Sequence, residues 1–268
     1  MKAKPADDGQ SPAGFFREIE IEFLIHELKD PLAVIETGVR TILDKRDKFG
    51  ALTERQERIL KRTLRNSNKA RAMLNSLLEV GRSEAGCYQC CRFDPVRVLY
   101  SALLESLDTV SDNIAERFRN FSSEDDARAY LLQEGIAISI EPAIAGREVF
   151  QDEIKVRQIL GNLIKNALQY RRSRMELRLW IENEQLQVEV IDDGPGIDPS
   201  DHQLVFQRYR QACECGASPR RGHGLGLAGA LILARCLGGD IRLESRRGIG
   251  TSFRLYLPLW FQDLKSNP

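Results

Sequence analysis

The chain has 268 residues, 42% of them hydrophobic, which is enough for one large domain or two modest ones with real cores. Lysine plus arginine and aspartate plus glutamate number 39 each, so the formal net charge is zero. This balance excludes a global electrostatic attraction to nucleic acid or to an anionic membrane, and any basic cluster has to be judged locally.

Neither the first residues nor the most apolar stretch has the character of an export or membrane segment. Residues 1–14 lack the apolar core of a signal peptide, and we expect a disordered leader there. The stretch from Leu225 to Leu237 is interrupted by Arg235 and is shorter than the roughly 20 residues that cross a bilayer. We therefore expect a cytoplasmic protein with no transmembrane segment, whose six cysteines are reduced thiols or metal ligands.

Residues 15–86 are predicted to form a helical hairpin. Apolar positions recur with gaps that alternate between three and four, which is typical of a bundle seam. Between the two predicted helices, Thr53 and Gln56 have the spacing of a capping box. Because a lone hairpin leaves its seam exposed, we expect a homodimer that forms a four-helix bundle. The seam positions are Ile25, Leu28, Leu32, Ile35, Val39 and Ile42, then Leu60, Leu64, Ser67, Arg71, Leu74 and Leu78.

A cysteine-rich linker, residues 87–93, is expected to precede a second domain at residues 94–268. Asp94 and Pro95 are suited to be the N-cap and the first residue of a helix that ends near Leu107. The fold class predicted for the whole chain is α+β, with the helical hairpin followed by an α/β sandwich rather than by a parallel doubly wound sheet.

The expected elements of the second domain follow in a regular order. A polar tract at 113–134 is followed by the strand GIAISIE, a helix over 152–170 and the strand pair MELRLWI and QLQVEVI around a turn at 182–184. After the glycine-rich segments DDGPGI and GHGLGLAG come a helix, the strand DIRLES, a GIGTSF turn and a final strand.

The segment HELKDPL contains the first group of candidate catalytic residues. His26 lies off the predicted apolar seam, Glu27 adjoins it, and Asp30 lies one turn away on the same face. A neutral imidazole can attack a γ-phosphoryl group, and a neighbouring carboxylate can orient the ring and take up its proton. Pro31 should bend or loosen the helix. The alternative is an ordinary surface histidine beside a solvated run of charges.

The segment NLIKNAL places Asn162 and Asn166 four residues apart, on one face of a helix. An asparagine carbonyl oxygen suits a Mg²⁺ ion that is already bound to triphosphate oxygens. The alternative is that the two side chains merely decorate the helix.

DDGPGI directly follows an apolar strand. The carboxylate of Asp192 could accept a hydrogen bond from an exocyclic amino group such as that of adenine, and Gly194 and Gly196 would let the backbone approach the base. The alternative is a tight turn around Pro195, and composition does not separate the two.

The segment GHGLGLAG, residues 222–229, opens a helix with glycines, which leaves backbone amides free to hold phosphate. Gly224, Gly226 and Gly229 also match a dinucleotide-binding fingerprint, with Glu244 placed as it requires. The preceding residues CECGASPRRGH cannot form the buried strand of a dinucleotide-binding unit, so we reject that interpretation. The phosphate-loop pattern G-x-x-x-x-G-K-[ST] is absent as well.

Taken in this order, the segments resemble the sensor histidine kinases of two-component signalling over about residues 15–259. HELKDPL resembles their H-box, NLIKNA their N-box, DDGPGI and GHGLGL their two glycine boxes, VFQRYRQ their F-box and GIGTSFRLYLP their closing strand motif. The resemblance implies an ATP-binding domain of the histidine-kinase and gyrase type, with ATP and Mg²⁺ as cofactors.

The resemblance also implies roles for individual residues. His26 would accept the phosphoryl group, Glu27 would be its acid/base partner, Asn166 would bind Mg²⁺ and Asp192 would read adenine. The phosphoryl group would then pass to an aspartate on the receiver domain of a response regulator. The residues expected around ATP are Asn162, Lys165, Asn166, Tyr170, Asp192, Gly194, Gly196, Ile197, Gly222, His223, Gly224, Leu225, Gly226, Leu227 and Thr251.

Several positions depart from the family pattern. Asp30 stands where Thr or Asn is usual, and we expect weak phosphatase activity toward the regulator. Gln169 replaces a usual basic residue, and the tract 113–134 is longer than the usual link. No input domain is recognisable, so the signal would arrive through an upstream sensor protein, the N-terminal helix or the cysteines. The candidates for the missing phosphate contact are Lys165, Arg171, Arg220 and Arg221.

The cysteines allow a weaker hypothesis. Cys87 and Cys90 in the linker, with Cys213 and Cys215 before the second glycine box, could hold a soft metal such as zinc and tie the two loops together. We favour the plainer alternative of unpaired thiols. Two alternatives to kinase function stay open: a pseudokinase scaffold, and an ATPase of the same superfold without phosphotransfer, which would have no need of HELKDPL.

Overall fold

The computed structural model describes residues 12–84, 88–121, 123–206 and 226–261. The chain divides into two compact units, Met1–Ala85 and Gly86–Pro268.

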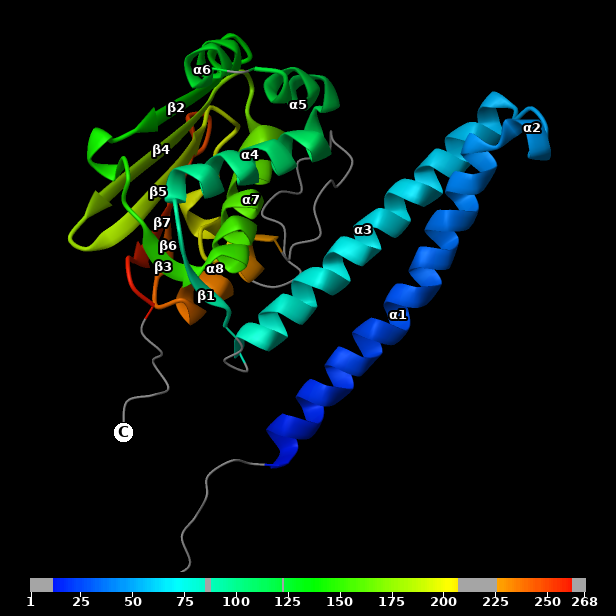
Figure 1. Ribbon diagram of the computed structural model, residues 1–268, viewed down its shortest axis with the longest axis horizontal. Helices are drawn as coiled ribbons and strands as arrows, with labels where there is room; N and C mark the ends of the chain where they lie inside the picture. Colours follow the sequence, from blue (N-terminus) through cyan, green and yellow to red (C-terminus); the bar gives the residue numbers. More distant parts are fainter. Residues whose placement is uncertain (1–11, 85–87, 122, 207–225, 262–268) are drawn as a thin grey trace, which may run out of the picture. The chain divides into compact units, whose positions relative to one another are not determined.

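The first unit is the predicted helical hairpin (Figure 1). Helix α1 spans Pro12–Asp44 and includes Pro31, a short helix α2 spans Arg46–Phe49 within the expected turn, and α3 spans Glu54–Glu84. The capping box is confirmed, since the Thr53 backbone N–H donates to Oε1 of Gln56 at 2.9 Å and the Gln56 N–H donates to Oγ1 of Thr53 at 3.3 Å.

The predicted seam of the hairpin is only partly covered in a single chain. Ile25 and Leu78 are buried, whereas Leu28 is 50% exposed and Ile35 is 44% exposed. Between the helices, buried Glu36 accepts an ion-paired hydrogen bond from Arg71 at 2.8 Å. The apolar side chains left in water are those that a second hairpin could cover.

The second unit is built on a five-stranded sheet in the order β2-β4-β5-β7-β6. Strand β2 pairs parallel with β4, and the other pairs are antiparallel. The register places Ile136, Met175, Asp192 and Thr251 in one row across four strands. The strands are β2 (Ile136–Ile140), β4 (Met175–Glu182), β5 (Gln185–Asp192), β6 (Asp240–Arg246) and β7 (Gly250–Pro258).

Helices α4 (Pro95–Val110), α7 (Glu153–Tyr170) and α8 (Gly226–Cys236) lie on one face of this sheet (Figure 1). Their apolar sides and the inward-facing strand residues form one continuous core. The predicted N-cap is confirmed, because the Asp94 carboxylate accepts from the backbone N–H of Val96 at 2.8 Å. The predicted sandwich therefore has a helical layer and a sheet layer.

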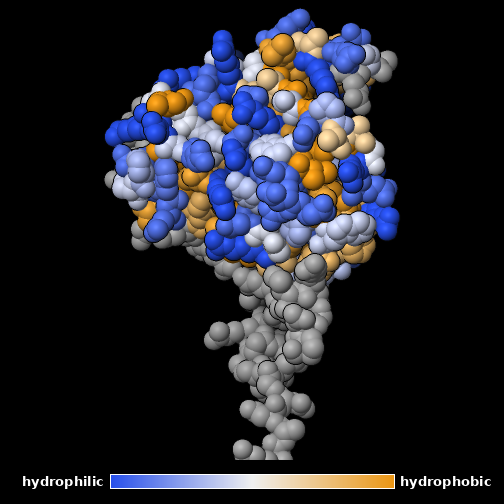
Figure 2. Space-filling model, turned by 90° about the vertical axis from the view of Figure 1, so that its left-hand side faces the viewer, coloured by the Kyte–Doolittle hydropathy of each residue, from blue (hydrophilic) through white to orange (hydrophobic). Residues whose placement is uncertain are grey.

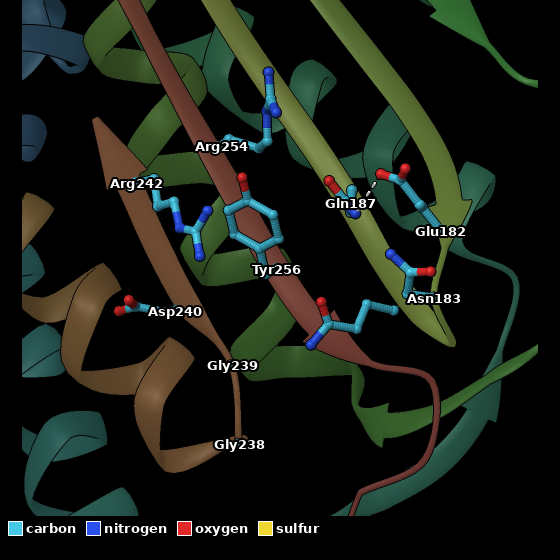
Figure 3. A pocket seen from close by; sticks show the side chains of 10 residues that line it. Glu182, Asn183, Gln187, Gly238, Gly239, Asp240, Arg242, Arg254 and Tyr256 are labelled. Carbon is cyan, nitrogen blue, oxygen red and sulfur yellow. Dashed lines mark hydrogen bonds between the residues drawn. The ribbon is translucent and has the colours of Figure 1, made fainter. Parts of the chain in front are cut away.

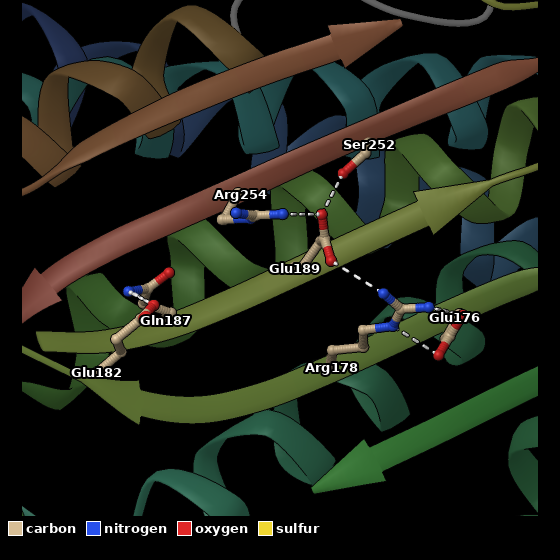
Figure 4. Close-up of polar contacts among 7 residues, drawn as sticks. All are labelled: Glu176, Arg178, Glu182, Gln187, Glu189, Ser252 and Arg254. Carbon is tan, nitrogen blue, oxygen red and sulfur yellow. Dashed lines mark hydrogen bonds and ion pairs between the residues drawn. The ribbon is translucent and has the colours of Figure 1, made fainter. Parts of the chain in front are cut away.

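The opposite face of the sheet is polar and is covered by its own long side chains. Glu189 lies there, because residues alternate between the two faces of a strand. Its carboxylate is buried by Ser252 and Arg254, each donating at 2.8 Å, and by Arg178 at 3.6 Å (Figure 4). Figure 2 shows one side of the molecule as mostly hydrophilic, with smaller hydrophobic areas between.

Two parts of the second unit differ from the sequence-based expectation. The tract at 113–134, expected only as a polar stretch, contains α5 (Asp112–Arg119) and α6 (Glu124–Gln133). These helices each bury a narrow apolar side, with Ala115 and Leu131 fully covered, and so form despite their polar composition.

The second difference concerns the expected linker at 87–93. Residues Cys90–Phe93 form strand β1, which pairs antiparallel with β3 (Val149–Asp152) in a separate two-stranded sheet. The backbone of this segment is held by a partner far along the chain, a contact that local composition does not reveal. The turn expected at 182–184 is present, with Asn183 and Glu184 both at positive φ, as a two-residue hairpin turn of type I′ requires.

Candidate functional site

Asp192 is the last residue of β5 and is buried, with 4% of its surface exposed. Burial raises the pKa of its carboxyl to about 6, and the charge of Asp193 adds to the shift, whereas a hydrogen bond from the Gly194 backbone N–H at 2.8 Å opposes it. A buried carboxylate with this little compensation is available to accept a hydrogen bond from a ligand.

The glycines that follow Asp192 are required by close backbone approaches. A Cβ atom at Gly194 would lie 2.6 Å from the Tyr170 carbonyl oxygen. Gly196 has φ +68°, and a Cβ there would lie 2.0 Å from the Arg246 carbonyl oxygen. The close approaches at these glycines are to backbone at the end of α7 and the end of β6, and the expected approach to a base stays a prediction.

The hydroxyl groups of Thr251 and Ser245 form a small hydrogen-bond network beside Asp192. Thr251, directly opposite Asp192 in the β5–β7 pair, is buried, and its Oγ1 lies 3.1 Å from Oγ of Ser245. Ser245 accepts from the backbone N–H of Ile197 at 2.8 Å and donates to the Gly250 carbonyl at 2.7 Å. Sequence reasoning included Thr251 and Ile197 but missed Ser245, which no motif marks.

Helix α7 carries the predicted asparagines. Its N-cap is Asp152, which accepts from the Lys155 backbone N–H at 3.1 Å. Asn162 and Asn166 are half-buried, as is Lys165. Oδ1 of Asn162 would lie 3.6 Å from a Cβ built on Gly226, the first residue of α8. The structure thus brings Asn162 of α7 next to the first residue of α8, and backbone amides at a helix N-terminus favour an anion.

Asp193 has a different role from its neighbour. It accepts hydrogen bonds from the backbone N–H groups of Arg172 at 2.8 Å and Ser173 at 3.1 Å, and from the Ser173 hydroxyl at 2.7 Å. Burial on its own would raise the pKa of this carboxyl, but the hydrogen bonds from residues 172–174 hold it well below its usual range. Sequence reasoning missed this residue, which fastens the segment after α7 to the first glycine box.

The structure gives Arg171 a role other than the suggested phosphate contact. Its Nη1 donates to the carbonyl oxygens of Glu134 at 3.1 Å and Gly135 at 3.2 Å. Desolvation lowers the pKa of the guanidinium, while Asp193 and Glu134 nearby oppose that shift. Arg171 therefore binds the end of α6.

Several predicted site residues belong to the first unit or lie outside the described residues. Glu27 and Asp30 are exposed on α1, in the other unit, and the side chain of His26 lies outside the described part of the chain. Tyr170 and Leu227 are described at the ends of α7 and α8 that border the site. The predicted residues outside the described ranges are Gly222, His223, Gly224, Leu225, Arg220, Arg221, Cys87, Cys213 and Cys215.

Of the four cysteines proposed as metal ligands, only Cys90 falls within the described ranges, in β1. Across residues 12–84, 88–121, 123–206 and 226–261, no group of three or more His, Cys, Asp or Glu side chains could hold a metal ion. Within the same ranges, none of the helices has the length and apolar character needed to span a bilayer.

A separate hollow of about 510 Å³ lies on the polar face of the sheet (Figure 3). It lies at the Gln185 end of β5, whereas Asp192 is at the other end of the same strand. Arg242 stacks on Tyr256 at its edge, with 4.8 Å between the guanidinium carbon and the ring centroid. None of the predicted nucleotide residues lines it.

Two family models match the chain. "His Kinase A (phospho-acceptor) domain" matches residues 20–86, and "Histidine kinase-, DNA gyrase B-, and HSP90-like ATPase" matches residues 151–260. Together they span more than half of the chain, with one model on each of the two structural units.

Curated proteins with similar sequences are sensor kinases. The aerobic respiration control sensor protein ArcB of Escherichia coli is 29% identical over 88% of this chain and 28% of ArcB. The circadian input-output histidine kinase CikA of Synechococcus elongatus is 29% identical over 87% of this chain and 29% of CikA. The chain therefore spans less than a third of the length of these two relatives.

Solved structures share the fold. Full-length ShkA, crystallised in complex with AMPPNP, aligns with a TM-score of 0.63 at 20% identity, over 91% of this chain and 46% of ShkA. The histidine kinase AdeS of Acinetobacter baumannii aligns with a TM-score of 0.51 at 18% identity, over 87% of this chain and 98% of that one.

Proposed function

Since this chain belongs to the sensor histidine kinases of two-component systems, we propose that it phosphorylates His26 with ATP and passes the phosphoryl group to an aspartate of a response regulator. The observation that supports ATP binding best is the buried carboxylate of Asp192, which has one backbone hydrogen bond and a pKa raised to about 6. A ligand amino group that donated to this carboxylate would offset the cost of its burial.

The described residues fit a magnesium nucleotide. Asp192 would read the exocyclic amino group of adenine, and the half-buried Asn162 and Asn166 would offer amide oxygens to Mg²⁺. When bound, Mg²⁺ neutralises charge on the triphosphate. The first residues of α8, beginning at Gly226, would face phosphate with their backbone N–H groups.

The transfer itself would use residues of the hairpin. A ring nitrogen of His26 attacks the γ-phosphorus, the bond from that phosphorus to the bridging oxygen breaks, and ADP leaves with the electron pair. The exposed carboxylate of Glu27, next in the chain, would orient the ring and take up its proton. We also propose a homodimer, because Leu28 and Ile35 stay exposed on the hairpin.

The direct test is to incubate the protein with γ-labelled ATP and Mg²⁺ and to measure acid-labile, base-stable label. His26→Gln should abolish the label and leave nucleotide affinity unchanged, since nucleotide and acceptor residues lie in different units. His202→Gln is the matched control, because its ring lies 3.3 Å from the backbone carbonyl of Ile197 in the second unit, away from the hairpin sequence, and it should keep the label. Full labelling of His26→Gln would exclude this acceptor, and nucleotide binding without any label in the unmodified protein would favour a pseudokinase.

The exposed Asp30 concerns the reverse reaction. Its carboxylate would place a negative charge near the aspartyl-phosphate of the regulator, so we expect weak phosphatase activity and a gain in the Asp30→Thr variant. A regulator dephosphorylation assay measures this, and faster dephosphorylation by the unmodified protein would contradict it.

A further inference from the structure

Arg171 joins the end of α7 to the end of the helical insertion α5–α6. It is the C-cap residue of α7, and its Nη1 donates to the backbone carbonyls of Glu134 and Gly135, which follow α6. Helix α6 has no basic residue of its own in its last turn. Arg171 therefore supplies, from another element, the cation that the negative end of a helix favours.

The backbone at this junction is closely packed. Gly135 has φ +77°, and a Cβ there would lie 2.0 Å from the carbonyl oxygen of Ser173. The Gly135 carbonyl also accepts from the Met175 backbone N–H at 2.8 Å. A shift at the end of α6 would therefore move residues 171–175 with it.

The same residues border the nucleotide site on their other side. Asp193 holds the backbone N–H groups of Arg172 and Ser173, and the Tyr170 carbonyl lies against Gly194. In the sheet, Ile136 at the start of β2 lies in one row with Asp192, two strands away, which corresponds to roughly 10 Å. Residues 170–175 thus touch the insertion with one side and the first glycine box with the other.

We propose that Arg171 is a positioning residue that couples the α5–α6 insertion to the nucleotide site, so that bound nucleotide and an ordered α6 stabilise each other. The inference rests on the proposed function, since it requires that nucleotide binds beside Asp192. A ligand that fixes the loop after Asp192 also fixes Asp193 and, through it, residues 172 and 173. Such coupling between two sites is reciprocal.

The test compares Arg171→Met with Arg172→Met in the full chain. Arg172 is an exposed neighbour whose bond to Asp193 uses only the backbone N–H, which methionine retains. Calorimetric titration with Mg-ADP should show an affinity about fivefold to tenfold weaker for Arg171→Met and unchanged for Arg172→Met. Arg171→Lys, which keeps the charge and part of the hydrogen bonding, should fall between them.

Hydrogen exchange provides a readout that a merely structural role would not move. In the unmodified protein and in Arg172→Met, saturating Mg-ADP should slow amide exchange over residues 124–135. In Arg171→Met, saturated with the same nucleotide, that added protection should be lost while residues 192–196 remain protected.

The possible outcomes separate this inference from the proposed function. If the unmodified protein does not bind Mg-ADP, the proposed function fails. If it binds and residues 124–135 exchange at the same rate with and without nucleotide, or if Arg171→Met behaves as Arg172→Met in both measurements, the coupling is refuted while ATP binding stands.

Discussion

The two units differ in how completely a single copy of the chain buries their apolar side chains. Among its described side chains, the hairpin buries only Ile25 and Leu78 as hydrophobic residues, and it leaves Leu28 and Ile35 in water. The second unit has a continuous core in which most members are fully covered. The hairpin is therefore expected to depend on a second copy, whereas the described part of the second unit has a continuous core of its own.

Buried carboxylates show the same contrast between incomplete and complete environments. Glu189 in the second unit has three partners, and the net effect of burial against its hydrogen bonds and the nearby arginines is a lowered pKa. Glu36 in the hairpin has Arg71 on one oxygen, while its buried Oε1 has no hydrogen-bond partner among the described residues. Asp192 is buried with a raised pKa. Glu189 is thus stabilised in its charged form by protein side chains, whereas Asp192 could accept a further hydrogen bond from a ligand.

The strongest way to break the contrast between the units is to make the hairpin seam acidic. Leu28 and Ile35 are seven residues apart and share a helix face. Leu28 and Ile35 are already about half covered in a single chain, so burying the rest of each is worth roughly half of the about 1.5 kcal/mol for a whole side chain. In the variant with both Leu28→Glu and Ile35→Glu, the dimer would lose this burial at four side chains, about 3 kcal/mol in all, so its Kd should rise roughly 100-fold or more. Light scattering coupled to size exclusion measures this.

The matched control for the seam variant is Thr37→Glu. Thr37 is exposed and lies on the opposite side of α1 from Leu28. It should leave the dimer intact, and nucleotide affinity should be unchanged in all these variants. A dimer that survived both acidic substitutions would place the interface on another face of the hairpin.

The next largest effect is expected at the ion pair between Glu36 and Arg71 inside the hairpin. Arg71→Met would leave the buried carboxylate of Glu36 without its cation, and because Arg71 is about half exposed we expect a loss of about 2 kcal/mol rather than the 3–5 typical of fully buried pairs. Adding Glu36→Leu removes the orphaned charge and should restore most of that stability.

Two optical signals separate the units in this experiment. Both tryptophans, Trp180 and Trp260, lie in the second unit, so their fluorescence should report an unchanged transition while the helical signal of the hairpin melts earlier. A double variant less stable than Arg71→Met would mean that Glu36 has a stabilising contact besides Arg71.

The sequence predicted the features that depend on residues close together in the chain, and it missed those that depend on distant partners. The two long helices followed from periodicity, and the capping box followed from Thr53 and Gln56, three residues apart. Asp192 was chosen as a candidate because the motif after it is contiguous. Strand β1 was missed because it is paired with a strand about sixty residues later, which no local pattern reveals.

The parts of the site that were missed share this origin. Ser245, Asp193 and Arg171 act through partners that the sheet register and the packing of α6 bring near. Arg171 was one of four candidates for a phosphate contact, whereas its side chain donates to carbonyl groups 36 and 37 residues earlier. Such roles require the three-dimensional arrangement.

The substitution Asp192→Asn is expected to raise the stability of the second unit while it abolishes nucleotide binding. Its pKa is raised from 3.8 to about 6 on folding, so its charge destabilises the fold as pH rises through about 6, and this cost is absent near pH 4. Two pKa units correspond to at most about 3 kcal/mol, and we expect Asp192→Asn to stabilise the second unit by about 1–2 kcal/mol at pH 8 and by little at pH 4.5. Urea unfolding followed by tryptophan fluorescence measures the difference.

The same substitution should abolish nucleotide binding, since the amide cannot replace the carboxylate acceptor and still receive the Gly194 N–H. In the unmodified protein, Mg-ADP affinity should fall as pH drops from 7 to 5, because protonated Asp192 accepts less well. A pH-independent affinity over that range, or equal stabilisation at both pH values, would contradict the assignment of the raised pKa to this group.

The smallest effect is expected where the hairpin depends only on local structure. Thr53 and Gln56 satisfy each other's backbone N–H groups at the start of α3 and lie far in sequence from the nucleotide residues. Thr53→Ala removes the side-chain acceptor of the capping box and should cost the hairpin about 1 kcal/mol, seen as an earlier loss of helical signal with unchanged tryptophan fluorescence. Thr63→Ala, in the middle of α3, is the control: alanine is the better helix former there, so its stability should be unchanged or slightly higher. If Thr53→Ala also lowered nucleotide affinity, a change in the hairpin turn would affect the second unit. The two units could then no longer be treated as independent.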